Sequence, residues 1–137
     1  MAEGARADAE NLTGVWNGLY TYSHGESVSF VATLIDSGGS FSGSIHELCC
    51  YSGSTIYAML AGARQGSAVS FLKTYEKSAG PQYVASVQYE GVLNGDATEI
   101  EGRWTIVAGS SGLSGKFLMI RSAGKAVEVE QEVSERV

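Results

Sequence analysis

The stretch Val87–Ile106, VQYEGVLNGDATEIEGRWTI, decides the fold of this chain. In its first half apolar residues and glycine alternate with polar residues, and the second half repeats this pattern up to Ile106. Such alternation is typical of a β-strand with one buried face, and Asn94-Gly95 between the two halves is a strong signal for a hairpin turn. The stretch therefore predicts two antiparallel strands joined at residues 94–97.

The rest of the chain contains more stretches of the same kind, separated by turns rich in glycine and serine. Together they predict eight strands: Val15–Tyr22, Glu26–Ile35, Phe41–Glu47, Thr55–Arg64, Ala68–Tyr75, Val87–Leu93, Ile100–Ile106 and Lys116–Arg121. No helical stretch separates them, so consecutive strands are expected to pair. We expect an all-β fold, an eight-stranded antiparallel up-and-down β-barrel without unpaired edges, with a two-sheet sandwich as the alternative.

Length and composition predict one domain with short flanking segments. The barrel is expected to span residues 12–121, preceded by a flexible N-terminal arm (1–11) and followed by an acidic tail (122–137). A formal net charge of −6 argues against binding to nucleic acid or to an anionic membrane surface. The start of the chain lacks a signal-peptide core, and no apolar run is long enough to span a bilayer. Cys49 and Cys50 are adjacent and so poorly placed for a disulfide, which favours a reducing, cytoplasmic location.

Antiparallel connections divide the loops between two ends of the barrel. One end receives the short turns at 37–40, 65–66 and 94–97, and the other receives the connections at 23–25, 48–54, 76–82 and 108–114, which are mostly longer. Binding residues concentrate on loops held by a rigid scaffold, so the long-loop end is the predicted mouth. At the other end Trp16 and Arg121 are predicted to be neighbours, with the guanidinium stacked on the indole to close the barrel floor.

The motif Gly14-Val15-Trp16, with a basic residue from the final strand, resembles the calycin superfamily, which includes lipocalins, fatty-acid-binding proteins and avidins. The sequences LTGVW (12–16) and GSFSG (39–43), and the stretch around Trp104, are most similar to avidins. The resemblance implies a ligand-binding barrel. However, Ile45 stands where avidins carry a tyrosine, and the fifth and sixth strands lack tryptophan. The resemblance therefore implies the architecture without the residues that bind biotin.

The register of the strands directs a set of polar and aromatic side chains toward the lumen: Tyr20, Tyr22, Glu47, Lys73, Tyr75, Tyr89 and Trp104. Lys73 interrupts an apolar inward series, and because a buried ammonium needs a partner, Glu47 is its expected counter-ion. A few polar groups among aromatic residues are typical of small-molecule sites. We therefore predict that these residues bind a small hydrophobic or amphipathic molecule. The alternatives are a structural ion pair, side chains that reach water at the rim, and aromatic residues that only fill the core.

No catalytic, cofactor or metal site is predicted, because the sequence shows no Ser-His-Asp order or paired-carboxylate motif, and His24 and His46 lack the spacing of metal ligands. The leading hypothesis is a non-enzymatic barrel that binds a small molecule at its long-loop end. One alternative is an oligomeric interaction barrel with a filled lumen. The other is a cyclase or isomerase that uses Lys73 or a tyrosine as its acid–base group.

Apolar residues also occupy the outward register of the strands: Val31, Ile35, Tyr57, Met59, Leu72, Val92, Leu118 and Ile120. A strand that is apolar on both faces needs a cover on its outer face. We therefore expect a homodimer or a higher homo-oligomer.

Overall fold

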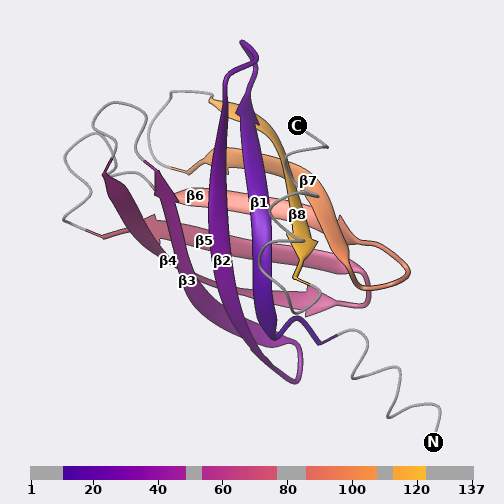
Figure 1. Ribbon diagram of the computed structural model, residues 1–137. Coiled ribbons are helices and arrows are strands. Elements are labelled where there is room, and N and C mark those ends of the chain that lie inside the picture. Colours follow the sequence, from indigo (N-terminus) through magenta and orange to yellow (C-terminus); the bar gives the residue numbers. More distant parts are fainter. Residues whose placement is uncertain (1–10, 49–53, 77–85, 108–112, 123–137) are drawn as a thin grey trace, which may run out of the picture.

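The computed structural model describes residues 11–48, 54–76, 86–107 and 113–122, which form eight β-strands (Figure 1). They are β1 (Gly14–Tyr22), β2 (Ser27–Ser37), β3 (Ser40–Leu48), β4 (Thr55–Gln65), β5 (Ala68–Tyr75), β6 (Val87–Leu93), β7 (Glu99–Ile106) and β8 (Ser114–Arg121). Each predicted strand is present, with ends that differ by no more than two residues. Apart from Asn11 and Ser122, the predicted arm and tail lie outside the described residues, as do Cys49 and Cys50.

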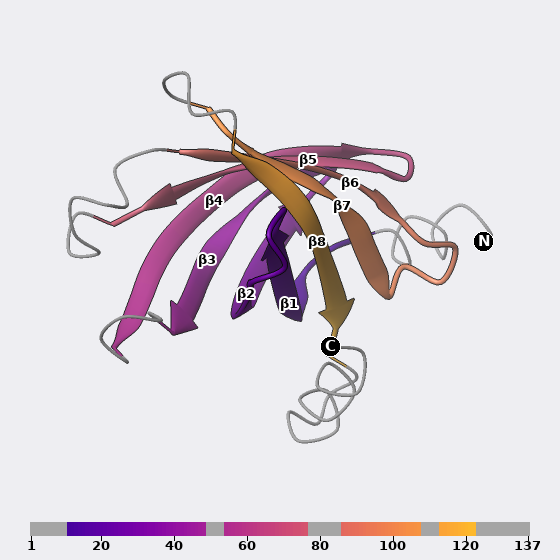
Figure 2. The same cartoon turned by 90° about the horizontal axis from the view of Figure 1, so that it is seen from above.

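Antiparallel pairing of consecutive strands closes the sheet on itself. β1 pairs with β2 on one side and with β8 on the other, so that the first and last strands run side by side (Figures 1 and 2). The up-and-down barrel is therefore confirmed and the sandwich alternative is wrong. Closure gives each of the eight strands a partner on both sides, which removes the unpaired edges of an open sheet.

Burial alternates along the strands as period-two side-chain placement requires; in β4, Ile56, Ala58 and Leu60 are buried and the residues between them are exposed. Glycine is required at inward positions where neighbouring strands lie very close together. A Cβ atom added to Gly62 would lie 2.0 Å from the Ser70 carbonyl oxygen. Only hydrogen fits in this space, and such positions let a sheet bend tightly around a narrow lumen.

A layer of aromatic side chains fills the middle of the lumen. Phe71 stacks on Tyr89 with ring centroids 4.7 Å apart, and Phe117 meets Tyr89 edge-on at 4.9 Å. Phe41 approaches Phe71 from the side at 6.1 Å. All four residues are buried. At this level, therefore, the protein's own side chains occupy the lumen.

The hairpin of β6 and β7 is closed by the side chain of Asn94. Its Oδ1 accepts hydrogen bonds from the amides of Thr98 at 2.8 Å and Glu99 at 3.0 Å. The amide of Ala97, which has a positive φ of 59°, donates to the Asn94 carbonyl. Asparagine favours turns because its side chain replaces missing backbone partners in this way.

The outer wall carries apolar side chains, as the outward register predicts. Five of the eight predicted residues are exposed: Ile35, Tyr57, Met59, Leu72 and Val92. Val31 and Leu118 are half-buried, whereas Ile120 is buried between Asn17 and Glu99, its partners on the neighbouring strands, and adds nothing to the exposed wall. Within the described part of the chain, no helix is long and apolar enough to cross a membrane.

Candidate ligand-binding site

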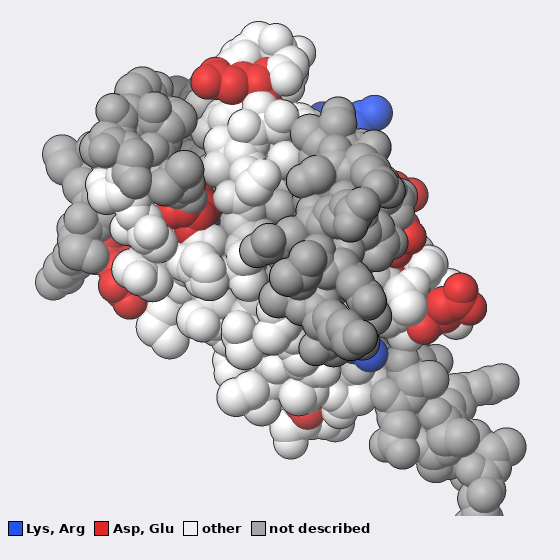
Figure 3. Space-filling view, viewed as in Figure 1, with Lys and Arg blue, Asp and Glu red and all other residues white. Residues whose placement is uncertain are grey.

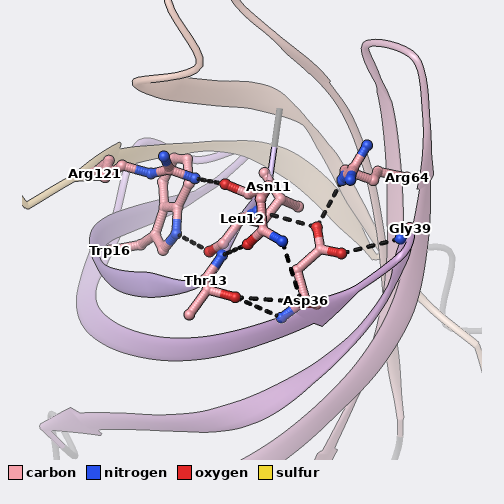
Figure 4. A network of polar contacts seen from close by, with 8 residues as sticks. All are labelled: Asn11, Leu12, Thr13, Trp16, Asp36, Gly39, Arg64 and Arg121. Atoms are coloured by element: carbon pink, nitrogen blue, oxygen red, sulfur yellow. Dashed lines mark hydrogen bonds and ion pairs between the residues drawn. The ribbon is translucent and has the colours of Figure 1, made fainter. Parts of the chain in front are cut away.

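The floor of the barrel is closed by Trp16 and Arg121, which pair across β1 and β8 (Figure 4). The Arg121 guanidinium lies 4.7 Å from the centroid of the indole, within the range of a cation–π contact. The indole Nε1 donates to the Leu12 carbonyl at 2.9 Å, and the guanidinium donates to the Asn11 carbonyl. The contact predicted from the sequence is present, and it also holds the chain segment that precedes β1.

Asp36 forms a second part of the floor that sequence reasoning missed. Its carboxylate is buried and accepts hydrogen bonds from the Leu12 amide at 3.0 Å, the Gly39 amide at 3.0 Å and Arg64 Nε at 2.6 Å (Figure 4). Burial raises the pKa of Asp36, but the hydrogen bonds and the positive charge of Arg64 outweigh it, so the pKa lies below its ordinary 3.8. The signal was available, since both Asp36 and Arg64 interrupt inward-facing series at the short-turn end.

At the other end of β1, Glu47 is the centre of a buried polar cluster. One carboxylate oxygen accepts hydrogen bonds from the hydroxyls of Tyr20 at 2.9 Å and Tyr75 at 3.0 Å. The other accepts from Lys73 Nζ at 3.4 Å, and Lys73 also donates to the Tyr89 hydroxyl at 3.1 Å. Glu47 is 4% exposed and Lys73 is 1% exposed. The expected ion pair is therefore present, and the alternative in which both side chains reach water is wrong.

Three aromatic rings surround the Lys73 ammonium. Its nitrogen lies 4.6 Å from the ring centroid of Tyr20, 4.5 Å from that of Tyr75 and 5.3 Å from that of Tyr89. Burial, opposed by the charge and hydrogen bond of Glu47, lowers the pKa of Lys73 from 10.5 to about 8. The ammonium is thus held by one carboxylate, one hydroxyl and three ring faces, which replace the water that burial removes.

The three phenols of the cluster stay protonated well above neutral pH. Burial is the largest influence, and it raises the pKa of Tyr20, Tyr75 and Tyr89 above the ordinary value of 10. The negative charge of Glu47 acts in the same direction on each of them. At neutral pH the cluster therefore offers hydroxyl groups, and its formal charges are those of Lys73 and Glu47.

Tyr22 and Trp104 lie next to this cluster at the end of β1. Trp104 meets Tyr20 and Tyr22 edge-on, with centroids 6.0 and 5.2 Å apart, and its Nε1 donates to the Thr21 carbonyl. Tyr22 is half-buried and also stacks on His24 at 5.3 Å. The structure thus brings all seven predicted residues together, with Tyr22 and Tyr75 half-buried and the other five buried. Their role in binding stays a prediction.

An open hollow of about 520 Å³ lies against the rim beside this cluster. It is lined by residues of β1, β7 and β8 and their flanks, among them Tyr22, Leu113, Arg103 and Lys116. Tyr22 thus belongs both to the hollow and to the aromatic group inside the barrel. Among the described residues, no three His, Cys, Asp or Glu side chains are grouped so that they could hold a metal ion.

Comparison with known proteins identifies the fold. No protein-family model matches the chain, and no curated protein is significantly similar to it. A redesigned β-barrel matches with a TM-score of 0.67 at 16% identity, over 81% of this chain and 91% of that chain. The redesigned barrel mFAP1 bound to DFHBI matches at 0.64 and 14% identity, over 80% and 94% of the two chains.

Apo shwanavidin, an avidin-like protein, matches with a TM-score of 0.57 at 16% identity, over 83% of this chain and 99% of that chain. At such identities the likeness concerns the fold alone. Together with the closed eight-stranded meander and its Trp16–Arg121 floor, it confirms the resemblance drawn from the sequence. The chain has the closed eight-stranded barrel fold that shwanavidin and the redesigned barrels share.

Proposed function

We propose that this protein is a non-enzymatic barrel that binds a small, partly apolar molecule at the end opposite the Trp16–Arg121 floor. The observation that carries the proposal is the cluster around Glu47, in which a carboxylate, an ammonium and three phenols lie buried among aromatic rings. Of the seven predicted site residues, Tyr22 and Tyr75 are half-buried and reach solvent.

The energetic cost of such a cluster favours a functional role. Removing two charges from water costs several kcal/mol per ion, and well-packed apolar residues in place of a buried ion pair are often as stabilising or more so. Stability alone therefore gives little reason to place Lys73 and Glu47 inside the barrel. A few polar groups fixed in an aromatic-lined cavity are, in contrast, what orients small molecules in binding sites.

The chemistry of the cluster limits the class of ligand. The hydroxyls of Tyr20 and Tyr75 donate to Glu47, whereas the Lys73 ammonium has three N–H donors and gives two of them to Glu47 and Tyr89. A bound molecule is therefore expected to carry a carbonyl, carboxylate or phenolate oxygen that accepts from Lys73. The edges and faces of Tyr22 and Trp104 suit an aromatic or apolar body. The similar barrel mFAP1 is described as bound to DFHBI, which supports a ligand of this kind.

The two tryptophans allow a direct test. Trp104 lies beside the cluster and Trp16 is part of the floor, so the variants Trp16→Phe and Trp104→Phe each leave one reporter. Titration with DFHBI is expected to quench the emission of Trp104 while leaving that of Trp16 unchanged, and Lys73→Met is expected to weaken binding at least tenfold. Native mass spectrometry of the purified chain checks for a retained small molecule. The proposal would be refuted if no small molecule were retained and DFHBI had no selective effect on the emission of Trp104.

We further propose that the barrel self-associates into a homo-oligomer. This proposal rests on Ile35 of β2 and on Tyr57 and Met59 of β4, which lie on the outer wall on either side of β3 and are 51–64% exposed. Large apolar side chains gathered on one face of a small protein usually mark an interaction surface. Sedimentation of the full chain at micromolar concentration tests it, because a single species of 14.4 kDa would exclude self-association.

A further inference from the structure

We infer that the outer wall of β2–β5 is the contact face of a homodimer, in which β4 of each protomer lies antiparallel to β4 of the other. The inference rests on the self-association proposed above and assigns it a surface and a register. It starts from the charges of these strands. Their four charged residues, Asp36, Glu47, Arg64 and Lys73, all occupy the inward register, and their outward positions carry no Asp, Glu, Lys or Arg.

The other side of the barrel has the opposite character. The outward positions of β6–β8 carry five charged residues: Glu90, Glu99, Glu101, Arg103 and Lys116. Figure 3 has the viewpoint of Figure 1, in which β1–β3 and not β6 face the reader, and there uncharged side chains occupy most of the described surface. Surfaces that face only water usually mix charges of both signs. A neutral wall on a chain of net charge −6 is therefore suited to contact with protein.

The chemistry of the wall favours a second copy of this chain as the partner. A charged partner would find no counter-charge there, whereas two acidic protomers repel each other least where both faces are neutral. Four strands about 4.8 Å apart, each with about eight residues rising 3.3 Å, cover roughly 500 Å² before side-chain relief is added. This approaches the ~800 Å² that each partner contributes to a standard interface.

The side chains along β4 indicate the register. Its outward residues are Tyr57, Met59, Ala61 and Ala63, so two large side chains are followed by two small ones. A twofold axis perpendicular to the strands, level with Leu60, places Met59 on the partner's Ala61 and Tyr57 on the partner's Ala63. A twofold axis parallel to the strands would instead place each large side chain against the same residue of the other protomer. Isologous contacts require such self-complementarity, which only the perpendicular axis provides.

The neighbouring strands leave room for this arrangement. In β3, Ser44 lies beside Met59, Ser42 beside Ala61 and Ser40 beside Ala63. These three serines let two β4 strands approach each other closely, whereas His46, beside Tyr57, adds a ring at the end of the contact. In β5, Leu72 lies beside Ala61 and adds apolar area where β4 itself carries little.

Two charge variants test both the wall and the register. In Met59→Lys and in Ala61→Glu, a charge is placed opposite an apolar residue of the partner, so each variant alone is expected to dimerise at least 100-fold more weakly. In an equimolar mixture the new lysine faces the new glutamate at one contact, while the other contact keeps Met59 against Ala61. The mixture is therefore expected to form a heterodimer. Val92→Lys, at an exposed position on β6, is the control and is expected to dimerise like the wild type.

Analytical ultracentrifugation of the full chains gives the readout, and circular dichroism verifies that each variant is folded. A monomeric wild type would refute self-association altogether. A dimeric wild type whose variants at positions 59 and 61 remain dimers would refute this wall but not self-association. Two monomeric variants that stay monomeric when mixed would refute the register. DFHBI binding is measured separately and depends on the lumen, so its failure leaves these outcomes unaffected.

Discussion

The substitution Lys73→Met measures the cost of the buried ammonium. Burial lowers the pKa of Lys73 from 10.5 to about 8 in the folded protein, against the opposing effect of Glu47. Between these two pH values the unfolded chain binds the proton that the native protein has released. The free energy of unfolding therefore rises with pH across this interval. At 1.36 kcal/mol for each unit of pKa, the rise amounts to about 3 kcal/mol.

The tyrosines of the cluster set the upper limit of this rise. The pKa values of Tyr20, Tyr75 and Tyr89 are raised in the native state, so above about pH 10 the unfolded chain loses phenolic protons that the native protein retains. Stability then falls with increasing pH. The wild-type protein is therefore expected to be most stable near pH 10, well above neutral pH.

Urea denaturation at intervals from pH 7 to pH 11 checks both the rise in stability due to Lys73 and the fall due to the tyrosines. The wild type is expected to gain about 1 to 2 kcal/mol between pH 7 and its maximum, because the tyrosines offset part of the rise due to Lys73, whereas Lys73→Met gains nothing from this source. At pH 7 the variant is destabilised by about 3 kcal/mol because Glu47 loses its counter-ion, and Lys73→Met with Glu47→Leu recovers most of that loss. Lys116→Met removes an exposed lysine and serves as the control. A rise that persists in Lys73→Met, or is absent from the wild type, would refute the reasoning.

Three further predictions concern the frame of the barrel. Arg121→Ala removes the stack on the floor indole and a backbone hydrogen bond, so thermal melting is expected to show a loss of about 2 kcal/mol. Asp36 contributes stability above about pH 4 that is lost as pH falls through its depressed pKa; Asp36→Asn should cost about 3 kcal/mol at pH 7 and flatten the acid limb in urea titrations. Gly62→Ala forces a Cβ into a backbone oxygen and should cost over ~3 kcal/mol, whereas Gly95→Ala meets nothing within 4 Å and should change the melting temperature little; equal effects would contradict the packing argument.

Much of the fold and part of the site follow from the sequence, because the alternation of apolar and polar residues along a strand indicates on which face of the sheet each side chain lies. Once consecutive strands are assumed to pair, the register places Lys73 and Glu47 in the same lumen, and the need for a counter-ion joins them. Trp16 and Arg121 follow in the same way from closure of β1 against β8.

The convergence of hydrogen bonds could not be predicted from pairing alone. Tyr20 and Tyr75 meet on a single carboxylate oxygen although they come from β1 and β5, which do not pair. Their separation across the lumen depends on strand tilt and stagger, which the alternating pattern does not specify. The contacts of Asp36 were missed for a related reason, since the Leu12 amide that it binds belongs to a segment that precedes the strands.

The charged side chains of β2–β5 face the lumen and the outer wall is neutral, which gives the Lys73–Glu47 pair a role in addition to the proposed ligand binding. In β5 the apolar Leu72 faces outward directly beside the inward Lys73. A slip of one residue in this strand would move the ammonium onto the neutral wall, away from Glu47, and put Leu72 into the polar cluster, because every side chain then changes face. Both the site and the proposed interface would be lost together. The pair therefore lowers the stability of the native state, as the pKa of Lys73 indicates. It destabilises the shifted register more than an apolar pair would, because leucine and methionine are accepted on either face of the sheet.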